Sequence, residues 1–394
     1  MRVLRLGDRP VSETAFQNCR IVDRARDFCG SVGIHGGKIA WVSEEPVYPG
    51  ARDLGGLLLT PAFVDLHAHL RTPGQTEKED FAHCLKAALK SGFAAICGMA
   101  NTSPAVDSAS LLKDNEKGAS KLRLARYRQI GALGLGLGDD SLSPLSEMLP
   151  FTKLFSNDGK NISSEAFLRN ALRQSREKGF WVLAHCEPET EMVRMHLRAL
   201  EKEGGNLHFC HISRRESVEA IREAKARGLS FTSEATPHHL YAYGLPYSVN
   251  PGFGSRNDRA SLLEAVRDGT IEILATDHAP HTPSDKRAGA CGISNMDYAF
   301  SMLWSVFRDN GIPFQRLSDM LSYQSAQKAG FCGIGLIEPG MDADLAIIDA
   351  EEETHIDTES FLSKSSNTPF NGATLLGVVK MTMVKGEIRY KNSN

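Results

Sequence analysis

The sequence predicts an α/β fold, a (β/α)8 TIM-like barrel beside a small composite β-sandwich domain. Two observations carry this prediction. Through the middle of the chain, eight short apolar runs with strand character alternate with helical stretches. The two ends of the chain lack this alternation and consist of short strand-like runs separated by turns. Repeated strand–helix units favour parallel strands covered by helices, and eight units match a closed barrel. A doubly wound open sheet is the main alternative.

The predicted sandwich domain combines residues 1–60 with residues 336–394. Gly36-Gly37 provides a turn between two N-terminal runs, and residues 344–349 and 378–384 have the same strand-like texture near the other end. Chain ends that flank an inserted domain often lie close together. We therefore expect both ends to pair into one β domain.

The predicted barrel domain covers residues 61–335. Its apolar runs are residues 62–65, 94–99, 124–130, 151–155, 181–184, 207–210, 229–234 and 271–275. Helices are expected at residues 79–91, 164–178, 190–203, 215–228 and 261–268. The Gly-rich stretch 131–138 and the following Asp139-Asp140 are predicted to form a mobile loop. This stretch lacks both GxGxxG and the P-loop Lys, so it does not indicate a phosphate cradle.

Composition and charge give no indication that the chain binds nucleic acid or a membrane. The chain of 394 residues carries 45 basic and 48 acidic side chains, so no broad basic face is expected for nucleic acid or an anionic membrane. No apolar run approaches the roughly 20 residues of a membrane span, and the first eight residues do not suggest a signal peptide. The eight cysteines are scattered without CxxC, which favours free thiols in a reducing cytoplasm.

Polar side chains follow the ends of the predicted barrel strands. His67 and His69 stand at i and i+2 after the first run, so in a strand both imidazoles point to the same face. Later runs are followed by Asn101, Asp158, His185, His211 and Asp277. In a barrel all of these lie on the C-terminal face, where active sites are found. One histidine after a strand is usually structural, but four histidines and two aspartates on one face favour a metal site.

The residue types suit Zn²⁺ or another borderline first-row divalent ion. Six candidate ligands exceed what one four-coordinate zinc needs while keeping a position open for water. We therefore predict two Zn²⁺ ions that share a bridging carboxylate, lower the pKa of a bridging water and polarise a scissile carbonyl. Asp277 could accept the proton of the attacking hydroxide and deliver it to a leaving nitrogen.

These motifs resemble those of the dihydroorotases, a family of the amidohydrolase superfamily, in the bacterial class whose bridging ligand is Asp. The most specific matching stretches are Val64-Asp65-Leu66-His67-Ala68-His69-Leu70-Arg71, Phe155-Ser156-Asn157-Asp158-Gly159, Cys210-His211-Ile212-Ser213 and Ala275-Thr276-Asp277-His278-Ala279-Pro280-His281. The resemblance runs from about residue 60 to residue 350. It implies reversible interconversion of dihydroorotate and N-carbamoyl-L-aspartate, a step of pyrimidine biosynthesis.

The resemblance also implies roles for individual residues. His67 and His69 would bind one metal ion with Asp277, while His185 and His211 would bind the other. Asp158 would bridge the two ions. Implied substrate contacts are His69, Arg71, Asn101, Asn250, His281, Cys291 and Gly292, with Arg71 and Asn101 holding the substrate carboxylate. Implied partners are a second copy of the chain and aspartate carbamoyltransferase.

Several alternatives remain open at this stage. Lys153 lies close to where hydantoinases and allantoinases carry a carboxylated bridging lysine. An enzyme of that neighbouring class, or a non-catalytic dihydroorotase-like scaffold subunit, would share much of the pattern. The family's Asn-Pro-Pro-Leu-Arg is replaced by Asn250-Pro251-Gly252-Phe253-Gly254, with Arg256 nearby. Glu187 is expected to support the site by hydrogen bonding.

Overall fold

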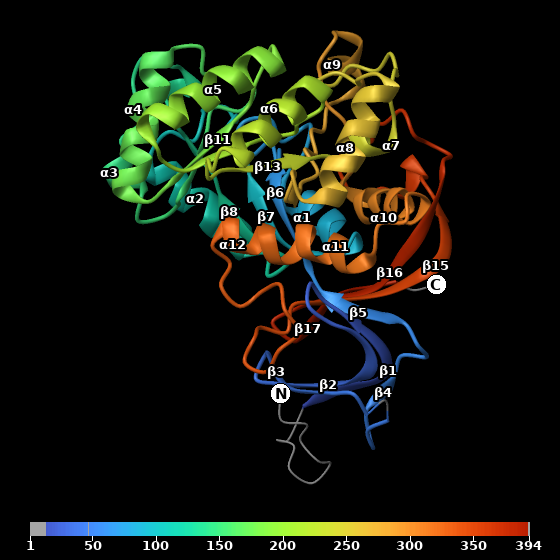
Figure 1. The fold of residues 1–394 in the computed structure, drawn as a ribbon. Coiled ribbons are helices and arrows are strands. Elements are labelled where there is room, and N and C mark those ends of the chain that lie inside the picture. Colours follow the sequence, from blue (N-terminus) through green and yellow to red (C-terminus); the bar gives the residue numbers. More distant parts are fainter. Residues whose placement is uncertain (1–12, 46, 393–394) are drawn as a thin grey trace.

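The computed structural model describes residues 13–45 and 47–392 (Figure 1). Residues 1–12 fall outside the described residues. The prediction that the first eight residues are not part of a signal peptide concerns this segment. Strands from both chain ends form one large sheet, and the middle of the chain forms parallel strands covered by helices. None of the described helices is long and apolar enough to cross a bilayer. All eight cysteines are free thiols, as predicted.

The sheet from the chain ends has the strand order β17-β16-β15-β5-β1-β2-β3, with β4 paired to β1. Its strands are β1 (Thr14–Val22), β2 (Asp27–His35), β3 (Lys38–Ser43), β4 (Arg52–Asp53), β5 (Leu58–Pro61), β15 (Leu345–His355), β16 (Thr374–Val384) and β17 (Glu387–Lys391). The antiparallel pairing of β5 with β15 joins the two ends, with Leu345 opposite Pro61. The expected pairing of the ends is therefore observed; the sandwich form and the domain limits stay predictions.

The long strands β15 and β16 also reach the helical layer, where they lie beside α10 (Ala299–Asp309) (Figure 1). Ser301 Oγ donates to Gly377 O at 2.6 Å, and Trp304 Nε1 donates to Ala350 O at 2.8 Å. A side chain at Gly377 would place its Cβ 2.7 Å from Trp304 Cδ1. This close approach fixes the terminal sheet against the helices.

The middle of the chain contains only parallel strand pairs. They are β6 (Phe63–Ala68), β7 (Phe93–Gly98), β8 (Arg126–Gln129), β9 (Gly131–Ala132), β10 (Leu154–Ser156), β11 (Trp181–Ala184), β12 (Leu207–Phe209), β13 (Thr232–Ala235) and β14 (Ile273–Leu274). The third predicted run, residues 124–130, contains β8. The start of the predicted Gly-rich loop is strand β9 instead. Asp277 N donates to His67 O, and His69 N donates to His278 O, which joins the segment after β14 to β6. The α/β class and the parallel strand order are confirmed.

Helices cover the outside of these strands (Figure 1). The longer ones are α1 (Phe81–Lys90), α2 (Ala109–Ser120), α4 (Glu165–Lys178), α5 (Glu189–Glu203), α6 (Arg215–Ala226) and α8 (Arg256–Asp268). Shorter helices are α3 (Leu145–Met148), α7 (Pro237–Tyr241), α9 (Pro283–Arg287), α11 (Phe314–Ser318) and α12 (Ser325–Ala329), with η2 (Leu135–Leu137), η3 (Met296–Tyr298), η4 (Asp319–Gln324) and η5 (Thr358–Ser360). The helix predicted at 261–268 begins earlier because Ser255 and Asp258 form a capping box.

Candidate metal centre and substrate cavity

The first group of predicted ligands meets where β6 ends beside the segment after β14. Asp277 Oδ1 lies 3.5 Å from His67 Nε2 and 3.2 Å from His69 Nε2. All three residues are buried. The i, i+2 spacing of the histidines therefore brings both rings to one carboxylate, as strand geometry requires.

The second group comes from the ends of β11 and β12. His185 Nδ1 lies 2.9 Å from His211 Nε2. Asp158 Oδ1 is 3.5 Å from that His185 nitrogen and 3.4 Å from the His211 nitrogen. These residues are buried as well. The two ring nitrogens and the carboxylate oxygen thus converge on a second point.

Asp158 lies between the two groups. Its Oδ2 is 3.4 Å from His69 Nε2, and its Oδ1 is 3.5 Å from His67 Nε2. His67 Nε2 and Asp158 Oδ1 are both buried without a hydrogen-bond partner. Buried polar atoms are normally paired, so these two atoms are placed for a ligand. The imidazole nitrogens and carboxylate oxygens are ligands that suit a divalent metal ion such as zinc.

Partners on the far side of the rings fix their orientation. His67 Nδ1 donates to Glu234 Oε1 at 2.7 Å, and His69 Nδ1 donates to Asn101 Oδ1 at 2.8 Å. Because both acceptors are oxygens, each Nδ1 carries a proton, and Nε2 is the ring nitrogen that faces the cluster. His208 Nε2 donates to Glu234 Oε2 at 2.9 Å.

Sequence reasoning missed Glu234 and assigned no role to His208. The available signal was a carboxylate inside the seventh apolar run, because a fully buried Glu requires a partner. Burial favours the neutral form of Glu234, but the facing His67 and His208 outweigh it and lower the carboxyl pKa to about 2. Glu234 therefore remains ionised.

Charges within the cluster oppose the effect of burial. Burial disfavours protonated His67, yet Asp158, Glu234 and Asp277 together raise its pKa well above the usual value. Burial likewise disfavours ionised Asp158, yet His67 and the other facing histidines hold its pKa well below the usual value. The charges of His67 and Asp158 therefore stabilise each other, and a bound metal ion would replace the proton on His67.

The backbone is strained at three of the predicted site residues. Arg71, His211 and Asp277 have φ angles of 56°, 33° and 47°. The left-handed region is uncommon for residues other than glycine and is held by the surrounding structure when it occurs at functional sites. Beside Asp277, the buried Asp65 accepts from Thr276 N at 2.9 Å and Thr276 Oγ1 at 2.6 Å. These bonds secure the segment that carries Asp277.

A cavity of about 250 Å³ opens onto the cluster. It is lined by His69, Arg71, Asn101, Asp158, Gly159, His185, His211, Val249, Asn250, Asp277, Ala279, His281, Cys291, Gly292 and Ile293. All seven predicted substrate-contacting residues line it. Asn101 also orients His69, so its position serves both the predicted metal ligand and the cavity.

Arg71 supplies a cation to the cavity wall. Its Nε donates to Pro280 O at 3.2 Å, and its Nη2 lies 3.1 Å from His281 Nε2. Burial lowers the Arg71 pKa to about 10, which leaves the guanidinium charged at neutral pH. Burial and the neighbouring Arg71 lower the His281 pKa to about 4. The wall therefore presents one cation beside a neutral imidazole.

The structure shows where the other residues named from the sequence lie. Lys153 is exposed and precedes β10, at the opposite end of that strand from Asp158. Arg256 is exposed in the first turn of α8 and does not line the cavity. The expected role of Glu187 is wrong: that residue is exposed, and the buried Glu189 instead accepts from Ser213 N at 3.0 Å. His238 and His239 are buried and hydrogen-bonded.

A profile of the Amidohydrolase family matches residues 58–389. The chain belongs to the amidohydrolase family. It is 32% identical to a dihydroorotase of Clostridium botulinum over 96% of this chain and 100% of that relative. It is 34% identical to a dihydroorotase of Anaeromyxobacter dehalogenans over 94% of this chain and 96% of the relative. Together, the family match and these relatives identify this amidohydrolase as a metal-dependent cyclic amidohydrolase.

Solved structures support the fold. The L-hydantoinase (dihydropyrimidinase) of Arthrobacter aurescens has a TM-score of 0.88 with 21% identity and covers 96% of each chain. The D-hydantoinase (dihydropyrimidinase) of Thermus sp. has a TM-score of 0.84 with 20% identity, covering 95% of this chain and 94% of the other. These similarities establish that this amidohydrolase shares the hydantoinase fold.

Proposed function

We propose that this amidohydrolase is a dihydroorotase that interconverts dihydroorotate and N-carbamoyl-L-aspartate. The observation that carries the proposal is the buried Arg71 guanidinium in the wall of the cavity that also exposes the cluster. The planar fork of Arg matches a carboxylate in a bidentate manner. Dihydroorotate carries a ring carboxylate, whereas hydantoin and allantoin do not.

We propose two Zn²⁺ ions held by His67, His69 and Asp277 on one side and by His185 and His211 on the other, with Asp158 bridging. The exposed position of Lys153 supports Asp158 as the bridge rather than a carboxylated lysine. When bound, such ions supply Lewis acidity toward the scissile carbonyl and lower the pKa of a bound water.

The chain's own groups then bind the substrate and move its protons. Arg71 and Asn101 hold the carboxylate, while Asn250, His281 and the backbone at Cys291-Gly292 contact the ring. Asp277 accepts a proton from the attacking water and transfers it to the ring nitrogen as the amide bond breaks. Its position 3.2 Å from His69 Nε2 places it at the edge of the cluster that faces the cavity.

Further proposals concern the whole chain. We propose that residues 1–60 and 336–394 form one composite domain and that residues 61–335 form a closed barrel. The proposed setting is a cytoplasmic homodimer that associates with aspartate carbamoyltransferase. Size measurement by light scattering, with and without that enzyme, would test the assembly.

The deciding experiment compares substrates on zinc-loaded protein. We expect turnover of dihydroorotate but not of hydantoin or allantoin. The variant Arg71→Met keeps an unbranched apolar stem but removes the charge and the guanidinium fork. We expect it to raise the KM for dihydroorotate at least about 100-fold, as loss of a charged hydrogen-bonded pair does. Preferred turnover of hydantoin or allantoin would instead assign the chain to the neighbouring class.

A further inference from the structure

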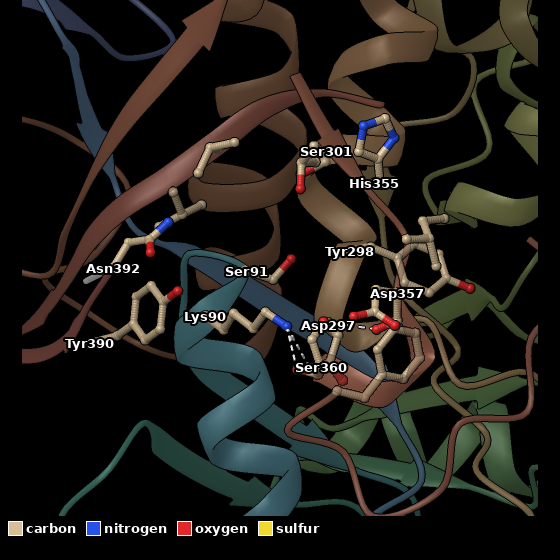
Figure 2. A pocket seen from close by; sticks show the side chains of 15 residues that line it. Lys90, Ser91, Asp297, Tyr298, Ser301, His355, Asp357, Ser360, Tyr390 and Asn392 are labelled. Carbon is tan, nitrogen blue, oxygen red and sulfur yellow. Dashed lines mark hydrogen bonds and ion pairs between the residues drawn. The ribbon is translucent and has the colours of Figure 1, made fainter. Parts of the chain in front are cut away.

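The connection between β15 and β16, residues 356–373, leaves the terminal sheet and crosses to the mouth of the substrate cavity. It is first anchored beside α1 and η3. Lys90 Nζ donates to Ser360 O at 3.0 Å and lies 3.4 Å from Asp297 Oδ1 (Figure 2). The Asp297 carboxylate also accepts from Leu362 N at 2.6 Å and Ser363 N at 3.1 Å. The start of the crossing is therefore fixed to the helical layer.

Two more bonds direct the chain toward the cavity. Lys364 N donates to Glu79 Oε2 at 3.1 Å, and Ser365 Oγ donates to Lys78 O at 2.6 Å. Glu79 is fully buried, and its Oε2 lies 3.3 Å from His278 Nε2. Through Glu79, the connection is thus linked to the segment that follows Asp277.

Asn367 is the residue that reaches the cavity loop, residues 279–294. Its Oδ1 accepts from His281 N at 2.8 Å and from Ser294 Oγ at 2.7 Å. Its Nδ2 donates to Gly292 O at 3.0 Å and to Ala279 O at 3.4 Å. Its own backbone oxygen accepts from Ser294 N at 2.9 Å. One side chain therefore bonds both the outgoing and the returning half of the loop.

We propose that Asn367 is a positioning residue that sets the geometry of the substrate-contacting loop, an inference that rests on the proposed function of that loop. Asn367 bonds the backbone of His281 and Gly292, and both of these residues line the cavity. Only a side chain with an acceptor and a donor satisfies both sets of partners. Asn367 would therefore act through its hydrogen bonds to the loop and not by contact with the substrate.

The loop itself has little freedom to compensate. Gly292 has φ 145°, and a Cβ there would lie 2.6 Å from Ala279 O. The two halves meet at the bond from Ala279 N to Ile293 O, 2.8 Å long. Because small misplacements of binding groups have large effects, loss of Asn367 should weaken substrate binding. Metal binding should not change, since Asn367 contacts none of the six cluster residues in the described structure.

The test compares Asn367→Ala and Asn367→Asp with Asn371→Ala. Asn371 lies in the same connection, is exposed, and bonds Thr358 N rather than the cavity loop. In the Asp variant, a carboxylate oxygen would face the Gly292 and Ala279 carbonyls. We expect both Asn367 variants to raise the KM for dihydroorotate about tenfold, with kcat and zinc content nearly unchanged. The Asn371 variant should match the wild type.

Amide hydrogen exchange measures the positioning without any substrate. We expect the peptide covering residues 279–294 to exchange about tenfold faster in both Asn367 variants than in Asn371→Ala. Unchanged exchange, or an equal change in all three variants, would overturn the inference. If one Asn367 variant fails to fold, the other decides. If the wild type does not turn over dihydroorotate, the proposed function fails, while the exchange result still decides whether Asn367 holds the loop.

Discussion

The two halves of the cluster differ in how their histidines are held. On the first side, His67 and His69 each donate a short hydrogen bond from Nδ1, to Glu234 at 2.7 Å and to Asn101 at 2.8 Å. On the second side, His185 Nε2 lies 3.5 Å from Asn250 Nδ2, at the limit of a hydrogen bond. The partners of the first half lie in β13 and shortly after β7, whereas Asn250 lies in the longer connection between α7 and α8. The second half therefore depends more on a loop. We therefore expect the second half to release metal first.

The largest expected effect comes from Asp158, which both halves share. Asp158→Ala should remove the carboxylate that lies within 3.5 Å of all four histidines. We expect bound zinc to fall below one ion per chain and kcat/KM to fall by at least about 10³-fold. Elemental analysis and steady-state kinetics measure both. Lys153→Ala is the control and should leave both unchanged; the reverse pattern would make Lys153 the bridge.

The next effect concerns the support of the first half. Glu234→Gln removes the charge that faces His67 and His208 while keeping the shape. Loss of such a partner typically costs about 10- to 100-fold in metal affinity or activity. Zinc titration in the presence of a competing chelator should show that the variant binds one zinc ion more weakly, namely the ion that the wild type holds more tightly. Glu187→Gln is the matched control because Glu187 is exposed, and equal zinc affinity in the two variants would contradict the asymmetry.

A smaller effect is expected on the second half. Asn250→Ala removes a contact of 3.5 Å, so we expect less than about tenfold loss in affinity for the weaker ion. In the wild type, chelator should remove zinc in two phases, and the variant should speed only the faster one. Acceleration of the slower phase would show that Asn250 does not act on one half alone.

The smallest effect involves a histidine outside the cluster. His196 is fully buried, and burial without a facing carboxylate lowers its pKa to about 4. The unfolded chain takes up a proton below about pH 6.5, whereas the folded chain does not until near pH 4, so acid destabilises the fold. When the pH is lowered from 7 to 5, the free energy of unfolding in urea should fall by about 2 kcal/mol less in His196→Leu than in the wild type. Equal losses would show that His196 is not held neutral.

The sequence predicted those parts of the site that depend on local periodicity. The i, i+2 pair His67 and His69 shares a face because side chains alternate along a strand. Each of the eight apolar runs overlaps a parallel strand, because the alternation of apolar runs with helical stretches is also a pattern of neighbouring residues. Asp158, His185 and His211 could be placed because each follows the end of such a run.

The rest depends on neighbours that are distant in the chain. Glu234 meets His67 across 167 positions, and Asn367 meets His281 across 86. No periodicity or motif links such pairs. Glu187 was expected to support the site by hydrogen bonding, but it is exposed, and it is Glu189, at the start of α5, whose carboxylate accepts from Ser213 N. Tertiary packing, not local pattern, chooses the supporting residues.

The crossing of residues 356–373 to the cavity has a consequence for synthesis. A nascent chain that has emerged through residue 335 carries all six cluster residues, but neither β15 to pair with β5 nor Asn367 to hold the loop. Because domains fold as they leave the ribosome, we expect zinc capture to precede competence for substrate. Ribosome-arrested chains of increasing length should therefore acquire zinc first and enzymatic activity only after the last strands emerge.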